Sequence, residues 1–87
     1  MIAFDAELFR YPGPSGWTFV VVPAADAPEP TRPWGRTPVV ATVDGLTYAT
    51  SVWRGRDGRT LLSIPARIRR GKDAGDGVRV ALTVDDR

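Results

Sequence analysis

Apolar and polar residues alternate with a period of two along several short stretches of the chain, the pattern of half-buried β-strands. In residues 2–8 the even-numbered positions are apolar, and acidic side chains lie between them. In residues 78–84 the even-numbered positions are apolar again, while Arg79 and Thr83 point the other way. Six such stretches without a long helical period predict an all-β fold, and a chain this short favours a closed or nearly closed six-stranded barrel that hides its strand edges.

Glycine and proline mark where the predicted strands end. Glycine-containing turns, PGPSG at 12–16 and RGRDG at 54–58, join strands into hairpins. The apolar runs that follow stop at Pro23 and Pro65, because proline cannot donate to a strand ladder and suits the first turn of a helix. After Pro65, the segment ARIRR closed by Gly71 predicts one short helical turn.

The chain carries an internal repeat. Residues 4–24 align with residues 46–66 at an offset of 42 without a gap, and VVATVDG (39–45) aligns with VALTVDD (80–86) at an offset of 41. The pattern predicts two related units, at about 2–44 and 45–86, within a single domain spanning 1–87. The identical pairs are Gly13 with Gly55, Gly16 with Gly58, Thr18 with Thr60, Pro23 with Pro65, and Ala24 with Ala66.

Composition limits the chemistry that this domain can perform. The 87 residues include no histidine and no cysteine, which removes the commonest general base, the commonest metal ligand and any thiol nucleophile. No stretch approaches the roughly 18–20 apolar residues of a membrane span, and the first residues do not form a secretory signal. We therefore predict a non-enzymatic protein without a cofactor or metal, located in the cytoplasm.

Basic residues gather in the middle of the chain. Residues 32–72 carry nine basic side chains against two acidic ones, so an anionic partner would bind there. One group follows Trp53 in a hairpin turn, and a second follows Pro65, at the two ends of one predicted strand. The candidates for contact with a ligand or nucleic acid are Arg54, Arg56, Arg59, Arg67, Arg69, Arg70, Lys72, Trp53 and Trp34. The competing interpretation is that these arginines only keep the turns soluble.

Four aromatic residues lie near turns and strand ends: Tyr11, Trp17, Trp34 and Trp53. We expect them to cap the open ends of a small barrel. The alternative is a shallow groove lined by Trp34, Trp53 and nearby arginines, suited to a small anionic or planar ligand.

The passage from Gly35 to Asp86, together with FDAELFRYPGPSGWTFVVVP at 4–23, resembles the DUF1905 domain family. The resemblance covers nearly the whole chain and implies the double-split β-barrel of AbrB-like regulators, in which Ile-Pro-x-x-Ile-Arg precedes Gly-Asp-x-Val. Here that pattern is Ile64, Pro65, Ile68 and Arg69, then Gly75, Asp76 and Val78. The resemblance implies no established activity. Longer members of the family often carry a second domain related to YdeI/OmpD-associated proteins; the resemblance does not tell whether this chain acts with a separate domain of that type.

The basic turn is present in only one of the two units, which argues against reading of palindromic DNA. The sequence therefore favours a small β-barrel module that binds a small ligand or a protein partner. Weak, largely sequence-independent nucleic-acid binding through the basic turns of the second half is the alternative. An enzyme relying on arginine and carboxylate alone is the third interpretation.

Overall fold

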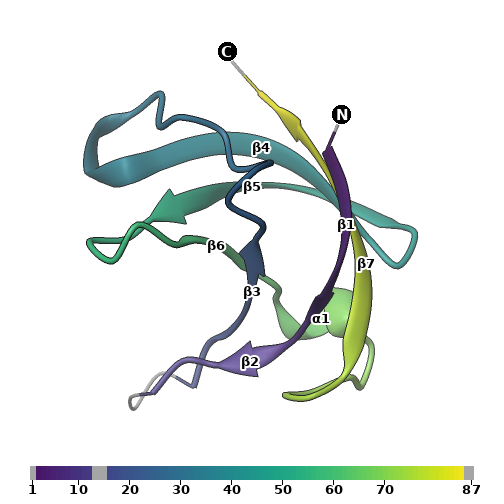
Figure 1. Ribbon diagram of the computed structural model, residues 1–87. Coiled ribbons are helices and arrows are strands. Elements are labelled where there is room, and N and C mark those ends of the chain that lie inside the picture. Colours follow the sequence, from purple (N-terminus) through teal and green to yellow (C-terminus); the bar gives the residue numbers. More distant parts are fainter. Residues whose placement is uncertain (1, 13–15, 86–87) are drawn as a thin grey trace.

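The computed structural model describes residues 2–12 and 16–85, which include seven strands, a 3-10 turn and one short helix. The elements are β1 (Ile2–Glu7), β2 (Phe9–Arg10), β3 (Thr18–Val22), η1 (Pro33–Gly35), β4 (Arg36–Val43), β5 (Leu46–Arg54), β6 (Thr60–Ser63), α1 (Ala66–Arg69) and β7 (Gly77–Val84). All strands belong to one antiparallel sheet with the order β1-β7-β4-β5-β6-β3-β2. Because β1 and β2 are consecutive in the chain yet occupy opposite ends of that order, the sheet curls into a nearly closed barrel (Figure 1).

The predicted alternation places the core inside this barrel. In β7, Val78, Val80 and Leu82 are buried and Arg79 is exposed, as the sequence predicts. Val20 of β3 and Leu62 of β6 are fully buried. Side chains from facing strands therefore pack together in the interior of the barrel, most of them aliphatic.

The all-β barrel is confirmed, but the count of six strands is wrong, because the first predicted strand is two. It breaks at Leu8, whose buried side chain faces the core. The amide of Leu8 donates to the carbonyl of Asp76 at 2.9 Å, and the amide of Gly75 donates to the carbonyl of Leu8 at 2.9 Å. Before the break β1 pairs with β7, and after it β2 pairs with β3.

The register of two strand pairs agrees with the predicted repeat. In the β3–β6 ladder, Val20 faces Leu62, its own counterpart at an offset of 42. Phe19 faces Ser63, and their counterparts at the same offset, Leu61 and Val21, also face each other. The β4–β7 ladder behaves in the same way at an offset of 41, with Ala41 facing Leu82 at its centre. Each of these ladders is thus related to itself by a two-fold exchange of the halves. Common origin of the halves by duplication stays a prediction.

The first strand departs from the aligned offset. Ala6 faces Val78 in β7, and at the offset of 41 found for β4 and β7, Val78 corresponds to Thr37. Thr37 faces Val52 of β5, so Ala6 corresponds to Val52, at an offset of 46. Phe9 faces Phe19 as Trp53 faces Leu61, which is an offset of 44. The segment that forms β1 and β2 therefore contains two more residues than the matching part of β5, and the two extra residues lie at the break between β1 and β2.

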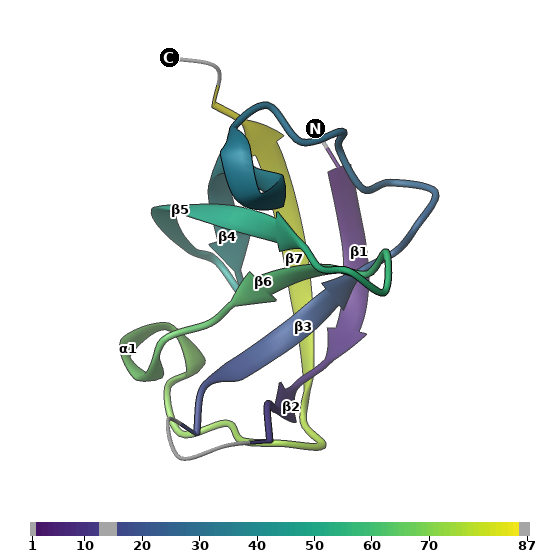
Figure 2. The ribbon, with the colours of Figure 1, turned by 90° about the vertical axis from the view of Figure 1, so that its left-hand side faces the viewer.

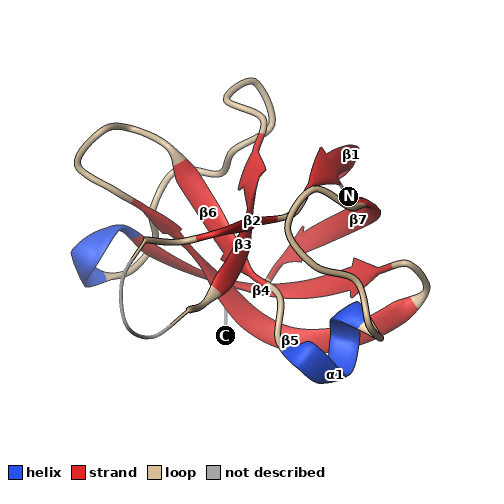
Figure 3. Ribbon diagram, turned by 90° about the horizontal axis from the view of Figure 1, so that it is seen from below, coloured by secondary structure: helices blue, strands red, loops and turns tan. Residues whose placement is uncertain are grey.

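The helical turn predicted after Pro65 is present as α1. Pro65 precedes its first residue, and the amide of Arg70 donates to the carbonyl of Ala66 at 3.2 Å. The turn ends at Arg69, one residue earlier than predicted, because Arg70 already has a left-handed φ of 50°. Figure 3 shows α1 and η1 outside the ring of strands. Among the described residues, no helix is long and apolar enough to cross a membrane.

Substituting alanine for each of two glycines with positive φ, one against β5 and one in open space, tests how closely η1 packs against β5. A Cβ at Gly35, where φ is 73°, would overlap the carbonyl oxygen of Arg54, whereas a Cβ at Gly45, where φ is 88°, would meet nothing within 4 Å. We expect Gly45→Ala to cost about 1–2 kcal/mol for its left-handed backbone. Gly35→Ala should cost roughly 1–3 kcal/mol more for the overlap. Urea unfolding measures both, and equal costs would show that η1 is not held against β5.

Candidate functional site

The basic turn after Pro65 is held by the chain itself at Asp44, in the turn between β4 and β5. The Asp44 carboxylate accepts from the backbone amide of Arg79 at 2.9 Å and from Lys72 Nζ at 2.8 Å. Arg70 donates to the carbonyl of Asp44 at 2.9 Å, and Lys72 Nζ also donates to the carbonyl of Gly77 at 2.7 Å. These bonds, the Arg79 amide first and Lys72 next, hold the pKa of Asp44 below its ordinary value.

Arg54 is engaged with the linker that precedes η1. It forms an ion pair with Glu29 at 3.2 Å, donates to the carbonyl of Pro28 at 3.2 Å, and reaches the hydroxyl of Thr60 at 3.5 Å. Its side chain is half-buried, so the guanidinium joins β5 to this linker. These contacts give Arg54 a structural role.

Arg59 is paired within its own turn. Its Nε lies 2.8 Å from the Asp57 carboxylate, which also accepts from the Arg59 amide at 3.0 Å. These bonds, the amide first, lower the pKa of Asp57. The Arg59 guanidinium also lies 5.9 Å from the ring centre of Phe9, within the range of a cation–π contact.

The remaining basic candidates differ in their surroundings. Arg69 is half-buried and donates to the carbonyls of Ile64 at 2.7 Å and Lys72 at 3.3 Å, but it forms no ion pair with a described residue. Arg56 and Arg67 are exposed and form neither a hydrogen bond nor an ion pair within residues 2–12 and 16–85. The two basic groups lie on either side of β6 in the chain, as the sequence predicts. That any of them binds a partner stays a prediction.

The expectation that four aromatic residues cap the barrel ends is wrong. Trp34 is 91% exposed in η1, and its backbone has a φ of 68°. Tyr11, Trp17 and Trp53 are 46%, 59% and 44% exposed. The barrel interior is filled instead by mostly aliphatic residues of facing strands, together with Phe4 and Tyr48, so these four rings are left on the outside. The central part of the predicted turn PGPSG, residues 13–15, lies outside the described residues.

Three of these exposed rings gather on one outer surface, around Phe19. Phe19 lies 5.7 Å from Tyr11, edge to face, and 6.2 Å from Trp17 and from Phe9 between ring centres. On the neighbouring strands, Trp53 faces Leu61 across the β5–β6 ladder. A groove of about 290 Å³ runs between Trp53 and Trp17. We call this surface the aromatic face; it consists of Phe9, Tyr11, Trp17, Phe19, Trp53 and Leu61.

A second depression adjoins the aromatic face on the other side of Trp17. It has a volume of about 350 Å³ and is lined by residues 16–18, residues 63–66 and Arg69. We call it the Thr18 hollow. Thr18 is 2% exposed, and its hydroxyl has no hydrogen-bond partner among the described residues. A buried hydroxyl without a partner is costly, so it is an unusual feature for the wall of a surface depression.

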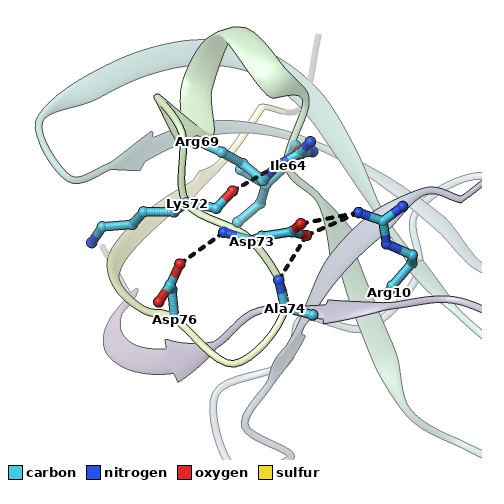
Figure 4. A network of polar contacts seen from close by, with 7 residues as sticks. All are labelled: Arg10, Ile64, Arg69, Lys72, Asp73, Ala74 and Asp76. Atoms are coloured by element: carbon cyan, nitrogen blue, oxygen red, sulfur yellow. Dashed lines mark hydrogen bonds and ion pairs between the residues drawn. The ribbon is translucent and has the colours of Figure 1, made fainter.

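Arg10 of β2 lies opposite Thr18 in the ladder but does not bond to it. Its guanidinium instead donates to both carboxylate oxygens of Asp73, at 3.0 and 3.2 Å (Figure 4). Asp73 lies in the turn between α1 and β7, whose amides also bond to acidic side chains. The Ala74 amide and then Arg10 lower the pKa of Asp73. Figure 2 shows this turn beside β2, so the ion pair fastens β2 to it.

A similar depression of about 310 Å³ lies near the other end of the β3–β6 pair. Its lining includes residues 21–22, Ala24, Ala27, Arg54 and residues 57–60. We call it the Thr60 hollow. Here the buried threonine has a partner, because Arg54 reaches its hydroxyl.

Sequence reasoning named Trp53 and Arg69 as candidate contact residues, placed Trp17 only among the aromatic residues expected to cap the barrel, and did not single out Thr18 or Phe19. Alternation in β3 places Thr18 inward and Phe19 outward, so the sequence holds a signal for each orientation. That Thr18 lacks a partner depends on where Arg10 points, and this is set by Asp73, 63 positions away. Trp34 lines neither hollow nor the groove, so the structure does not unite it with Trp53.

Comparison with known protein families supports the assignment made from the sequence. The model of a family described as a domain of unknown function, DUF1905, matches residues 4–84, nearly the whole chain. None of the curated proteins matched the chain. The family match identifies kinship but gives no ligand or activity.

Asp44 gives the basic turn a measurable pH dependence. Because its folded-state pKa lies below the unfolded value, its contribution to stability is complete above about pH 4 to 5 and is lost as the pH falls through the folded-state pKa. Asp44→Asn tolerates the left-handed φ of 48° but loses the charge. We expect it to lower the free energy of unfolding by roughly 1–2 kcal/mol at pH 7 and by much less near pH 2.

Chemical denaturation at both pH values measures the effect, with Asp26→Asn as the control because that carboxylate is exposed and bonds to no described residue. A loss of stability for Asp44→Asn that is the same at pH 7 and pH 2 would contradict the role assigned to its charge.

Proposed function

As this chain belongs to the DUF1905 family of domains of unknown function, we propose its role from the structure: it is a non-enzymatic binding module that holds a small ligand with a flat apolar body. The observation that carries this proposal is the aromatic face. Tyr11, Trp17 and Trp53 leave about half of their surfaces in solvent, although a barrel of this size has few large side chains to spare from its core. Contiguous exposed apolar surface of this kind commonly marks a binding site.

The shape of the surface favours a small ligand over a flat protein interface. Trp17 stands between the groove of about 290 Å³ and the Thr18 hollow of about 350 Å³, and Ser63 also borders both. These volumes lie near the lower end of the range for small-molecule sites, which are mostly apolar with a few polar groups. A ligand with a flat ring would stack against the Trp17 indole, with a polar wall beside it.

Weak nucleic-acid binding is kept as the alternative outcome. Aromatic side chains stack on unpaired bases, and Arg56 and Arg67 are exposed. Three of the seven basic candidates, Arg54, Arg59 and Lys72, are already in ion pairs with carboxylates, which reduces the charge they offer to a phosphate backbone. A protein partner that covers the aromatic face is a third possible outcome of the binding experiments.

A cytoplasmic location remains part of the proposal, because the chain has no cysteine for disulfides.

The proposal predicts that flat aromatic compounds bind beside Trp17. In a ¹H–¹⁵N NMR screen with fragments and short single-stranded oligonucleotides, we expect fragments to shift the amide signals of residues 16–19, residues 61–64 and Ala66. Trp17→Ala should weaken binding about tenfold, equivalent to about 1.4 kcal/mol. Trp34→Ala is the matched control, because Trp34 is exposed but borders neither depression.

Two results would overturn this function. One is the absence of fragment shifts at these residues at millimolar concentrations. The other is micromolar oligonucleotide binding at physiological salt that Trp17→Ala leaves unchanged, with a salt dependence that Arg67→Ala flattens.

A further inference from the structure

The two hollows are built from corresponding positions in the two halves of the barrel. Shifting residues 16–18 by 42 gives residues 58–60, and shifting residues 63–64 back by 42 gives residues 21–22; each set lines its own hollow. Ala66 and Ala24 correspond in the same way. The Thr60 hollow is therefore an internal reference against which the Thr18 hollow can be compared.

The buried threonines differ in whether their hydroxyls have a partner. In the ladders, Arg54 faces Thr60 and Arg10 faces Thr18. Arg54 reaches the Thr60 hydroxyl at 3.5 Å, a long hydrogen bond, while Arg10 is drawn away to Asp73. The Thr18 hydroxyl is consequently left without a partner among the described residues. Two equivalent sites thus differ in one unmet hydrogen bond.

The hollows also differ in charge. The two arginines that line the Thr60 hollow, Arg54 and Arg59, are neutralised by Glu29 and Asp57. The Thr18 hollow has Arg69 at the position that corresponds to Ala27, and no carboxylate among the described residues forms an ion pair with it. The Arg69 guanidinium is held in place by carbonyl oxygens, which orient it without cancelling its charge. The Asp73 carboxylate, whose pKa Arg69 also helps to lower, forms its ion pair with Arg10 instead.

These differences, together with the proposed function on which this step rests, lead us to infer that the Thr18 hollow takes an aromatic carboxylate. The ring of the ligand lies against Trp17 and Pro65, and its carboxylate accepts from Arg69 and Thr18. A carboxylate fits better than a phosphate, because one guanidinium and one hydroxyl among apolar walls supply few donors for a doubly charged group. The Thr60 hollow, with its charges and hydroxyl already paired, does not take this ligand.

The Thr18 hydroxyl exposes less than 1 Å² to solvent, so a ligand reaches it after rotation of the side chain about Cα–Cβ. A rotation of about 120° moves the hydroxyl into another of the three staggered positions on Cβ, held until then by the methyl group or the hydrogen. Thr18→Val keeps the shape and removes the hydroxyl. It should therefore leave the thermal midpoint unchanged or raise it, while it weakens binding.

The test compares two probes of nearly the same size and shape, the anionic indole-3-acetate and the neutral indole-3-acetamide, in NMR titrations at pH 7 and low salt. We expect the acid to bind the protein at least tenfold more tightly than the amide, with shifts at residues 16–18 and 63–66. Arg69→Gln should bring the ratio of the two affinities near one, whereas Arg69→Lys should keep most of the preference for the acid. Comparing the two variants separates the loss of the charge from any disturbance of the turn that the Arg69 side chain holds. Thr18→Val should weaken the acid about fivefold, whereas Thr60→Val, the matched control, should change it less than twofold.

The outcomes separate this inference from the function it rests on. If acid and amide bind equally and both depend on Trp17, the carboxylate inference fails and the binding module stands. If Thr60→Val weakens the acid and Thr18→Val does not, the wrong hollow has been assigned. If neither probe nor any other flat fragment shifts these residues, the proposed function fails as well.

Discussion

The break at Leu8 is the constraint on which the rest of this structure depends. Its backbone exchanges hydrogen bonds with the turn at 75–76, and this releases the chain from β7 so that β2 can pair with β3. Without the break, a single straight strand would leave the sheet open at one side. The same turn holds Asp73, which takes the Arg10 guanidinium away from Thr18. Closure of the barrel and the unmet hydroxyl therefore have a common origin.

Much of the fold follows from local patterns in the sequence. Alternation identifies the inward faces of β1 and β7, and proline marks the ends of β3 and β6. The offsets of the repeat agree with the registers of the β3–β6 and β4–β7 ladders, although the sequence did not predict which strands pair. The break at Leu8 could not be predicted this way, because an apolar residue at an even position continues the alternation. It is set by backbone bonds to residues almost 70 positions away.

The candidate site was predictable by residue type but not by arrangement. Composition pointed to the basic turns, and the structure places Glu29, Asp44 and Asp57 against three of their side chains. Those partners come from the linker and from hairpin turns, so only the folded register shows which charges remain. The same holds for the aromatic face, where residues from β2, β3, β5 and β6 meet across three ladders.

The two halves of the barrel have similar strands and similar core residues, but the side chains that line their hollows differ. The half-barrel interiors use similar aliphatic residues, while Trp17 corresponds to Arg59 and Arg69 to Ala27 at the hollows. A departure from local rules, such as the buried Thr18 hydroxyl that has no partner among the described residues, is expected at functional positions. The difference between the halves thus carries more functional information than the features they share.

A crystal structure of the protein with a bound aromatic carboxylate tests this account most directly. We predict a single ligand in the Thr18 hollow, its ring against Trp17 and its carboxylate at Arg69 and Thr18, with the Thr60 hollow free of ligand. A ligand in the Thr60 hollow, or equal occupancy of both hollows, would contradict the claim that their differences define the site.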